Sequence, residues 1–116
     1  MDIQKFGYDF YSDHKYKKSK DLEIIAEFTT NHQGDTSRLI KLFDYSIKAG
    51  CRVIKLQKRN VESFYSKKEL EKKYITPLSK TFYEYRNKLE LNEEQIDIVK
   101  NYKKKYDLKI IFSALD

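Results

Sequence analysis

Residues 23–57 read EIIAEFTTNHQGDTSRLIKLFDYSIKAGCRVIKLQ, and this stretch decides the fold. It contains two short, mostly apolar runs, Glu23 to Phe28 and Arg52 to Gln57, which are typical of strands covered on both faces. Between them, apolar residues recur about every four positions over residues 37–49, which predicts an amphipathic helix. A strand, a helix and a strand in a segment of this size imply parallel strands joined by a right-handed crossover.

The ends of this helix carry their own signals. Asp35 and Thr36 are both good N-cap residues. Gly50 stands where a left-handed C-terminal cap belongs. The apolar face that should meet the sheet consists of Leu39, Ile40, Phe43 and Ile47.

Residues 58–91 form a long polar connection after the second strand. We expect two short helices in it, Ser66 to Lys73 and Thr81 to Leu89, separated by Pro77. Long connections in compact domains are usually functional or disordered. This one has enough aromatic residues to pack, namely Phe64, Tyr65, Tyr74, Phe82, Tyr83 and Tyr85.

A further helix and a third strand follow this connection. Asn92 to Gln95 resembles a capping box with an acidic first turn, and the apolar stripe behind it continues to Tyr106. Lys109 to Ser113 is typical of a strand. The sequence thus predicts a parallel α/β fold of three strands with two connecting helical segments. We expect residues 1–22 to form an N-terminal arm or hairpin ahead of a domain that spans residues 23–116.

The composition fits one domain and narrows its partners. The chain has 116 residues, of which 40% are hydrophobic, enough for a core. Its net charge of +6 favours anionic partners, although lysines that coat solvated helices give the same balance. Cys51 is the only cysteine, which excludes an internal disulfide, and no Cys/His cluster suggests zinc. With neither a membrane-spanning run nor a signal-peptide pattern, we expect a cytoplasmic protein.

Strand alternation brings four polar side chains onto one face. Counting along each strand from its apolar start, this face carries Glu27, Lys55, Gln57 and Ser113. Parallel α/β folds bind their ligands at the carboxyl ends of the strands, where these residues lie. The sequence therefore predicts a site of an acid, a base, an amide and a hydroxyl. The alternative is that Glu27 and Lys55 form a structural ion pair, and a buried pair of that kind adds little stability.

The loop after the first strand holds two further candidates, Asn31 and His32. A lone loop histidine is more often a hydrogen-bonded structural residue than a metal ligand. Because no second ligand stands at a useful spacing, we expect no metal site formed by this chain alone.

These segments resemble a known family. The sialic acid synthase (N-acetylneuraminate synthase) family is similar to this chain over residues 23–116, in the segments Ile24-Ile25-Ala26-Glu27, Asn31-His32-Gln33-Gly34-Asp35, Val53-Ile54-Lys55-Leu56-Gln57, Tyr83-Glu84 and Leu89-Glu90-Leu91. The resemblance implies a partial (β/α)8 TIM barrel. It also implies an enzyme that condenses phosphoenolpyruvate with an N-acetylated aminosugar, uses a divalent metal ion (Mn or Mg) and forms a homodimer.

The resemblance also implies roles for the polar face. Glu27 matches the family's catalytic-site acid and Lys55 a lysine that binds the phosphoenolpyruvate anion. Gln57 matches a glutamine that contacts the sugar, and Ser113 falls at a hydroxyl position near the phosphate. Asn31 and His32 are possible loop contacts. A lysine in a partly desolvated site stabilises phosphate and carboxylate charge strongly, so these roles are physically reasonable.

The chain departs from the family in two segments and in length. It has Phe28-Thr29-Thr30 where the family usually has a glycine, and Ser113-Ala114-Leu115-Asp116 where it usually has a Ser-Thr-Pro-Phe-like segment. A complete barrel takes about 250 residues. The family's metal-binding histidines lie on later strands. We therefore expect a truncated barrel that is inactive alone, with phosphoenolpyruvate, the aminosugar and the metal bound by the complete enzyme.

Two other functions fit parts of the sequence. A non-catalytic basic module could bind nucleic acid through the Lys- and Tyr-rich segments 8–20 and 101–106. A different phosphoenolpyruvate-dependent enzyme, such as a 3-deoxy sugar acid synthase, would share the barrel. The Asn-His-Gln-Gly-Asp loop favours the sialic acid group. We expect no membrane partner.

Overall fold

A parallel crossover unit forms the first part of the fold, as the sequence predicts. The computed structural model describes residues 23–115, so the N-terminal arm predicted for residues 1–22 lies outside the described residues. Within the described part, β1 (Ile25–Thr29) leads through α2 (Thr36–Lys48) to β2 (Val53–Arg59). β1 and β2 are parallel neighbours in the sheet. The predicted helix and both predicted strands are therefore confirmed, with ends shifted by up to two residues.

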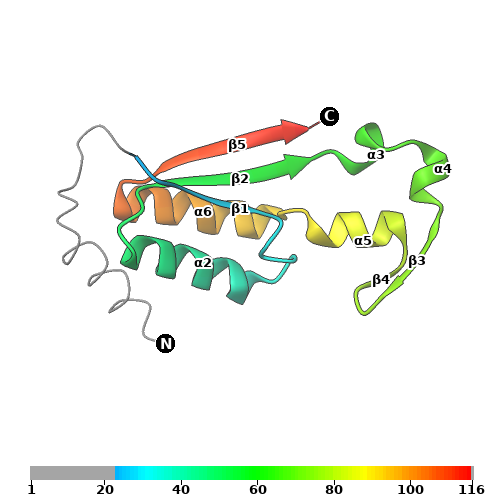
Figure 1. Cartoon of the computed structure of the whole chain (residues 1–116), viewed down its shortest axis with the longest axis horizontal. Helices are drawn as coiled ribbons and strands as arrows, with labels where there is room; N and C mark the ends of the chain where they lie inside the picture. Colours follow the sequence, from blue (N-terminus) through cyan, green and yellow to red (C-terminus); the bar gives the residue numbers. More distant parts are fainter. Residues whose placement is uncertain (1–22, 116) are drawn as a thin grey trace.

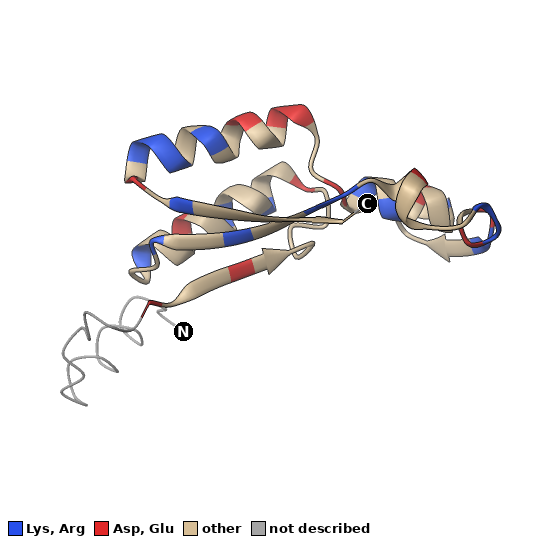
Figure 2. Ribbon diagram, turned by 90° about the horizontal axis from the view of Figure 1, so that it is seen from above, with Lys and Arg blue, Asp and Glu red and all other residues tan. Residues whose placement is uncertain are grey.

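The second helix and the third strand repeat this arrangement. α6 (Glu93–Tyr106) leads into β5 (Lys109–Leu115), which pairs with β2 in parallel, so the strand order is β1-β2-β5. Both α2 and α6 cover the same face of the sheet (Figure 1). Figure 2 shows the acidic start and the basic end of α6, a charge order that complements the helix dipole.

One hydrophobic core joins the sheet to its two helices. Phe43 of α2 packs edge-on against Phe28, with ring centroids 5.2 Å apart, and stacks on Tyr102 of α6 at 4.8 Å. The other buried members of this core are Leu39, Ile54, Leu56, Leu91, Val99 and Leu108. Each such side chain contributes about 1.5–3 kcal/mol by leaving water. This burial fixes which face of each strand turns towards the helices.

Polar groups fix the ends of the helices and bind them to each other. The Asp35 carboxylate accepts the Arg38 N–H at 2.7 Å at the start of α2. Asn92 and Gln95 form the capping box predicted for α6. The Tyr102 hydroxyl donates to Asp44 Oδ1 at 2.6 Å and so connects α6 to α2. Burial, with the Asp44 carboxylate beside it, raises the pKa of Tyr102 to about 12, so this donor keeps its proton.

The connection between β2 and α6 forms an extension at one end of the sheet (Figure 1). It contains, in order, α3 (Val61–Phe64), α4 (Lys67–Leu70), the antiparallel pair β3 (Lys73–Thr76) and β4 (Ser79–Thr81), and α5 (Phe82–Leu89). The helix predicted from Ser66 to Lys73 is wrong in its second half, where β3 begins. Pro77 lies in the turn between β3 and β4, because its fixed φ suits a turn and its missing N–H suits no helix.

Aromatic side chains pack the extension. The Phe82 ring lies edge-on to Tyr65 at 5.0 Å and to Tyr74 at 5.7 Å. Tyr74 also packs on Tyr85 at 4.8 Å. The prediction that these residues let the long connection pack is confirmed.

No helix within residues 23–115 is long and apolar enough to cross a membrane.

Two strands run further than the sequence pattern indicates. β2 continues through Lys58 to Arg59, and β5 continues to Leu115. The Asn60 N–H then donates to the Leu115 carbonyl at 3.0 Å. Pairing between the two strands therefore overrides the loss of apolar pattern after Gln57 and extends the sheet at its carboxyl edge.

The loop between β1 and α2 comes against the backbone of α5 at one glycine. Gly34 has φ +71°, and a Cβ built on it would lie 1.9 Å from the Lys88 carbonyl oxygen. Gly50, after α2, has φ +95° but no heavy atom within 4 Å of the same position. The two glycines share a left-handed backbone and differ only in the space around them.

We predict that Gly34→Ala destabilises the protein by more than about 3 kcal/mol, because the backbone of α5 must move. The matched control Gly50→Ala adds only backbone strain, about 1–2 kcal/mol. Urea denaturation of both variants measures the difference. If both variants lose the same free energy of unfolding, Gly34 does not lie in close contact with α5 in solution.

Candidate functional site at the carboxyl ends of the strands

The register of the sheet brings the four predicted site residues onto one face. Glu27 of β1 is the partner of Lys55 in β2, and Gln57 is the partner of Ser113 in β5. These residues alternate with Ile54 and Leu56, which point into the core on the helix side. The polar residues therefore lie on the opposite face, towards the carboxyl ends of the strands. Their placement is as predicted, and their roles stay predictions.

An ion pair links the first two of these residues. Lys55 Nζ lies 3.1 Å from Glu27 Oε1, and the two side chains are 33% and 52% exposed. The sequence-based argument assumed a buried pair, but this pair meets solvent. A pair with that exposure contributes about 0–1 kcal/mol to stability. Because the pair adds so little, breaking it costs little free energy, and either side chain can reorient to contact a ligand.

Gln57 and Ser113 lie beside each other and half-buried. Within residues 23–115, neither side chain has a hydrogen-bond partner, whereas most half-buried polar side chains of the extension have one. An amide can donate and accept at once, and a hydroxyl does the same. Together with Lys55, these groups offer hydrogen-bond donors to an anion. To a sugar hydroxyl they offer both donors and acceptors.

The loop residues Asn31 and His32 have different surroundings. Asn31 is exposed and lines a cavity of about 410 Å³ between this loop and the extension, with Thr76 and Tyr85 among the other lining residues. His32 is fully buried, and its Nδ1 accepts the Gly34 N–H at 3.0 Å. His32 therefore helps to hold the loop, and its other ring nitrogen, Nε2, is buried without a hydrogen-bond partner among residues 23–115. That it contacts a ligand stays a prediction.

Gln95 holds the same loop from the other side. Its side chain is buried, and Nε2 donates to the Gly34 carbonyl at 3.0 Å and to Thr36 Oγ1 at 3.2 Å. The sequence identifies Gln95 as part of a capping box. Nothing in the neighbouring sequence indicates that its side chain also binds a loop 61 residues away. The N-terminus of α6 therefore positions the loop that follows Glu27.

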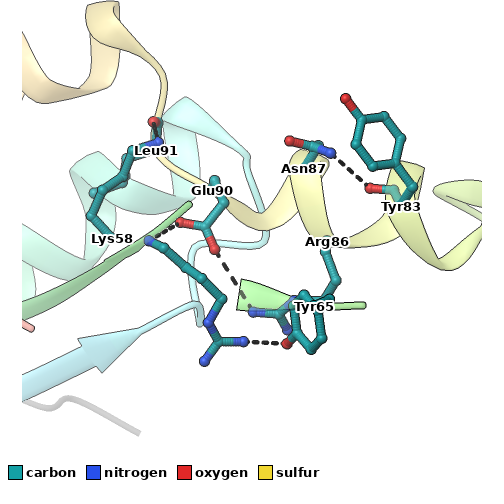
Figure 3. A network of polar contacts seen from close by, with 8 residues as sticks. Lys58, Tyr65, Tyr83, Arg86, Asn87, Glu90 and Leu91 are labelled. Carbon is teal, nitrogen blue, oxygen red and sulfur yellow. Dashed lines mark hydrogen bonds and ion pairs between the residues drawn. The ribbon is translucent and has the colours of Figure 1, made fainter. Parts of the chain in front are cut away.

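A polar network at the end of β2 has no counterpart in the sequence predictions. The nearly buried Glu90 accepts the Arg59 backbone N–H at 2.8 Å and lies 3.7 Å from Arg86 (Figure 3). Lys58 Nζ donates to the Leu91 carbonyl at 2.7 Å. In the sequence, the one hint of this network is a charged residue, Glu90, between two leucines that are buried in the structure.

The metal ion implied by the family resemblance finds no ligand set in this part of the chain. Within residues 23–115, no three His, Cys, Asp or Glu residues come together in a way that could hold an ion. The divalent metal stays a prediction for the complete barrel.

The fold is that of the parallel α/β proteins, a class whose members bind ligands where the strands end. Residues 42–116 match the NeuB family, and the chain belongs to that family. It is 30% identical over 95 residues to the N-acetylneuraminate-9-phosphate synthases of Drosophila melanogaster and Homo sapiens. It is 34% identical over 93 residues to the uncharacterized protein MJ1065 of Methanocaldococcus jannaschii. These matches cover 80% of this chain but 24–26% of each relative, so the chain spans about a quarter of their length.

The buried histidine predicts that the stability of the protein depends on pH. Burial lowers the pKa of His32, so the folded protein binds this proton less readily than the unfolded chain, whose histidine titrates near 6.5. We predict that stability is constant above that pH and falls as the pH drops below it, because protonation also removes the acceptor for the Gly34 N–H.

The measurement is the urea midpoint between about pH 5.5 and 7.5, above the carboxylate range. His32→Asn keeps a side-chain acceptor and should remove the slope at some cost in stability. His14→Asn, the control, should keep the slope. A slope that survives in His32→Asn would contradict the assignment.

Proposed function

We propose that residues 23–115 supply three strands of a (β/α)8-barrel synthase that condenses phosphoenolpyruvate with an N-acetylated aminosugar to give a sialic acid. The observation that carries the proposal is the shared face of Glu27, Lys55, Gln57 and Ser113 at the carboxyl ends of the strands. Family membership and relatives named as N-acetylneuraminate-9-phosphate synthases support it.

The arrangement of the sheet supports the barrel. Its three strands are parallel, and strands that follow one another along the chain in this sheet are neighbours in space. Both α2 and α6 cover one face of the sheet. A TIM barrel repeats this arrangement around its circumference, with the helices outside and the site at the carboxyl ends of the strands. In the proposed barrel, the face with Glu27 and Lys55 turns towards the interior.

The proposed chemistry joins the methylene carbon of phosphoenolpyruvate to the aldehyde carbon of the sugar, whose oxygen takes up a proton and becomes a hydroxyl. Water then adds to the carbon that bears the phosphate and gives up a proton. The bond from that carbon to the phosphate oxygen breaks, and inorganic phosphate leaves. Lys55 binds the carboxylate or phosphate of phosphoenolpyruvate as a charge-assisted donor. The Glu27 carboxylate, released from Lys55, orients or deprotonates the attacking water.

The other two groups orient the reactants. Gln57 both donates to and accepts from sugar hydroxyls, and Ser113 donates to a phosphate oxygen. Holding two reactants in one geometry lowers the barrier by removing the entropy of their encounter. Because the relatives' name specifies N-acetylneuraminate 9-phosphate, a sialic acid product is favoured over a 3-deoxy sugar acid.

We predict that Lys55→Ala lowers kcat/KM about 10²–10³-fold, or about 3–4 kcal/mol, in the polypeptide that carries the complete barrel. The assay follows phosphate release from phosphoenolpyruvate that depends on an N-acetylated aminosugar. Lys103→Ala, an exposed lysine on α6, is the control and should leave turnover unchanged. Near-normal turnover in Lys55→Ala would overturn the role proposed for this residue. Residues 1–116 alone should show no turnover.

A further inference from the structure

One turn at the end of β1 has a backbone conformation that its residue does not favour. Thr29 has φ +48°, in the left-handed region that glycine adopts easily. A β-branched residue is rarely found there, because its side chain crowds the neighbouring backbone. The Asn31 N–H donates to the Phe28 carbonyl at 2.8 Å and closes the turn around Thr29. The backbone of this turn is therefore strained.

The Thr29 side chain contributes little to the fold. The residue is half-buried, and within residues 23–115 its hydroxyl bonds only to the adjacent Phe28 carbonyl, at 2.8 Å. A glycine would make the same turn without the strain. Stability alone therefore does not explain a threonine in this turn.

The surroundings of the turn impose its conformation from both sides. On one side, the Phe28 ring is buried in the core against Phe43. On the other, His32 is buried and Gly34 lies against the Lys88 carbonyl. A negative φ at position 29 would move one of these two anchors. Strain of this kind persists only where the surrounding structure determines the conformation.

Under this constraint, the side chain at position 29 decides how freely the turn can move. At positive φ, glycine has a broad range of allowed backbone angles. Threonine has only the small left-handed region, and its branched side chain is itself stiff. A glycine would therefore remove the strain and also widen the range of conformations at the end of β1.

The turn follows directly on Glu27. The register of β1 with β2 is regular as far as Glu27, the partner of Lys55. It shifts at the next residue: Thr29 is the partner of Leu56, which leaves Phe28 as an extra residue. A bulge of this kind bends its strand and re-aims the side chains beside it. The conformation of the turn thus affects the direction in which Glu27 leaves the sheet.

Little else restrains the Glu27 side chain among the described residues. It is 52% exposed, and within residues 23–115 its one charged partner is Lys55, at 3.1 Å. In the proposed reaction Lys55 binds phosphoenolpyruvate, so this contact is lost when the Glu27 carboxylate acts on water. The backbone that carries Glu27 is then the restraint that remains.

We infer that Thr29 is a positioning residue for Glu27: its side chain keeps the turn in one conformation and so keeps the carboxylate in one direction. The inference rests on the proposed function, in which this carboxylate orients or deprotonates water, and adds the residue that holds it. Positioning matters to the rate, because a small misplacement of a reacting group can cost a large part of it.

The backbone dynamics of residues 1–116 test the first step. Thr29→Gly should lower the NMR order parameters of Glu27 and Phe28 from about 0.85, typical of a rigid backbone, towards about 0.6. Thr29→Val keeps the branched side chain and should keep the higher values. Gln33→Gly is the matched control, because Gln33 also has a positive φ, +53°, in the same loop. It should leave both order parameters unchanged.

Turnover in the polypeptide that carries the complete barrel tests the second step. Thr29→Gly should lower kcat at least about tenfold and leave the KM for phosphoenolpyruvate unchanged, because Lys55 still binds this anion. Urea denaturation should show that this variant is at least as stable as the unaltered protein, so the loss is not one of folding. Thr29→Val and Gln33→Gly should both keep kcat within about twofold.

The outcomes separate this inference from the proposed function. If the unaltered polypeptide shows no turnover that depends on an aminosugar, the proposed function fails and the inference fails with it. If it turns over and Thr29→Gly keeps either its kcat or its order parameters, only the inference is wrong. An equal loss of kcat in Gln33→Gly would also contradict it, because the effect would then belong to the whole loop.

Discussion

The register between β2 and its two neighbours is the constraint on which the rest of the structure depends. Ile54 and Leu56 must point into the core between α2 and α6, so the residues that alternate with them, Lys55 and Gln57, must point the other way. A slip of one residue would bury Lys55 among the helices and expose the leucine and isoleucine. Such a slip would give up several buried apolar side chains, each worth about 1.5–3 kcal/mol. Hydrophobic burial on one face thereby positions the polar groups of the other.

The loop after β1 is held by contacts that come from far along the chain. Gln95 binds the Gly34 carbonyl, the α5 backbone leaves room for no side chain at Gly34, and His32 closes the loop from inside. The two hydrogen bonds are largely shielded from water, so losing one leaves a polar group without a partner, which destabilises the fold. The extension and α6 consequently determine how the chain leaves the strand that carries Glu27.

The sequence predicts the elements whose signals are local and misses those that depend on distant partners. α2 and α6 follow from apolar spacing and from caps at Asp35 and Asn92. Alternation within each strand puts Lys55 and Glu27 on the same face, and the register between the strands makes them partners. The hairpin of β3 and β4 is missed because a lysine-rich segment before Pro77 fits a helix equally well until it packs against α5. The contact of Glu90 with Arg59 joins residues 31 positions apart, and no periodicity reports it.

The two faces of the sheet contribute very differently to stability. The helix-facing side holds the apolar core, whereas the ion pair of Lys55 and Glu27 is partly exposed and contributes about 0–1 kcal/mol. Changes on the polar face therefore cost the fold little, so a binding site there can vary while the core stays the same. The network of Arg59, Arg86 and Glu90 is different, because its charges are largely buried with some donors unpaired.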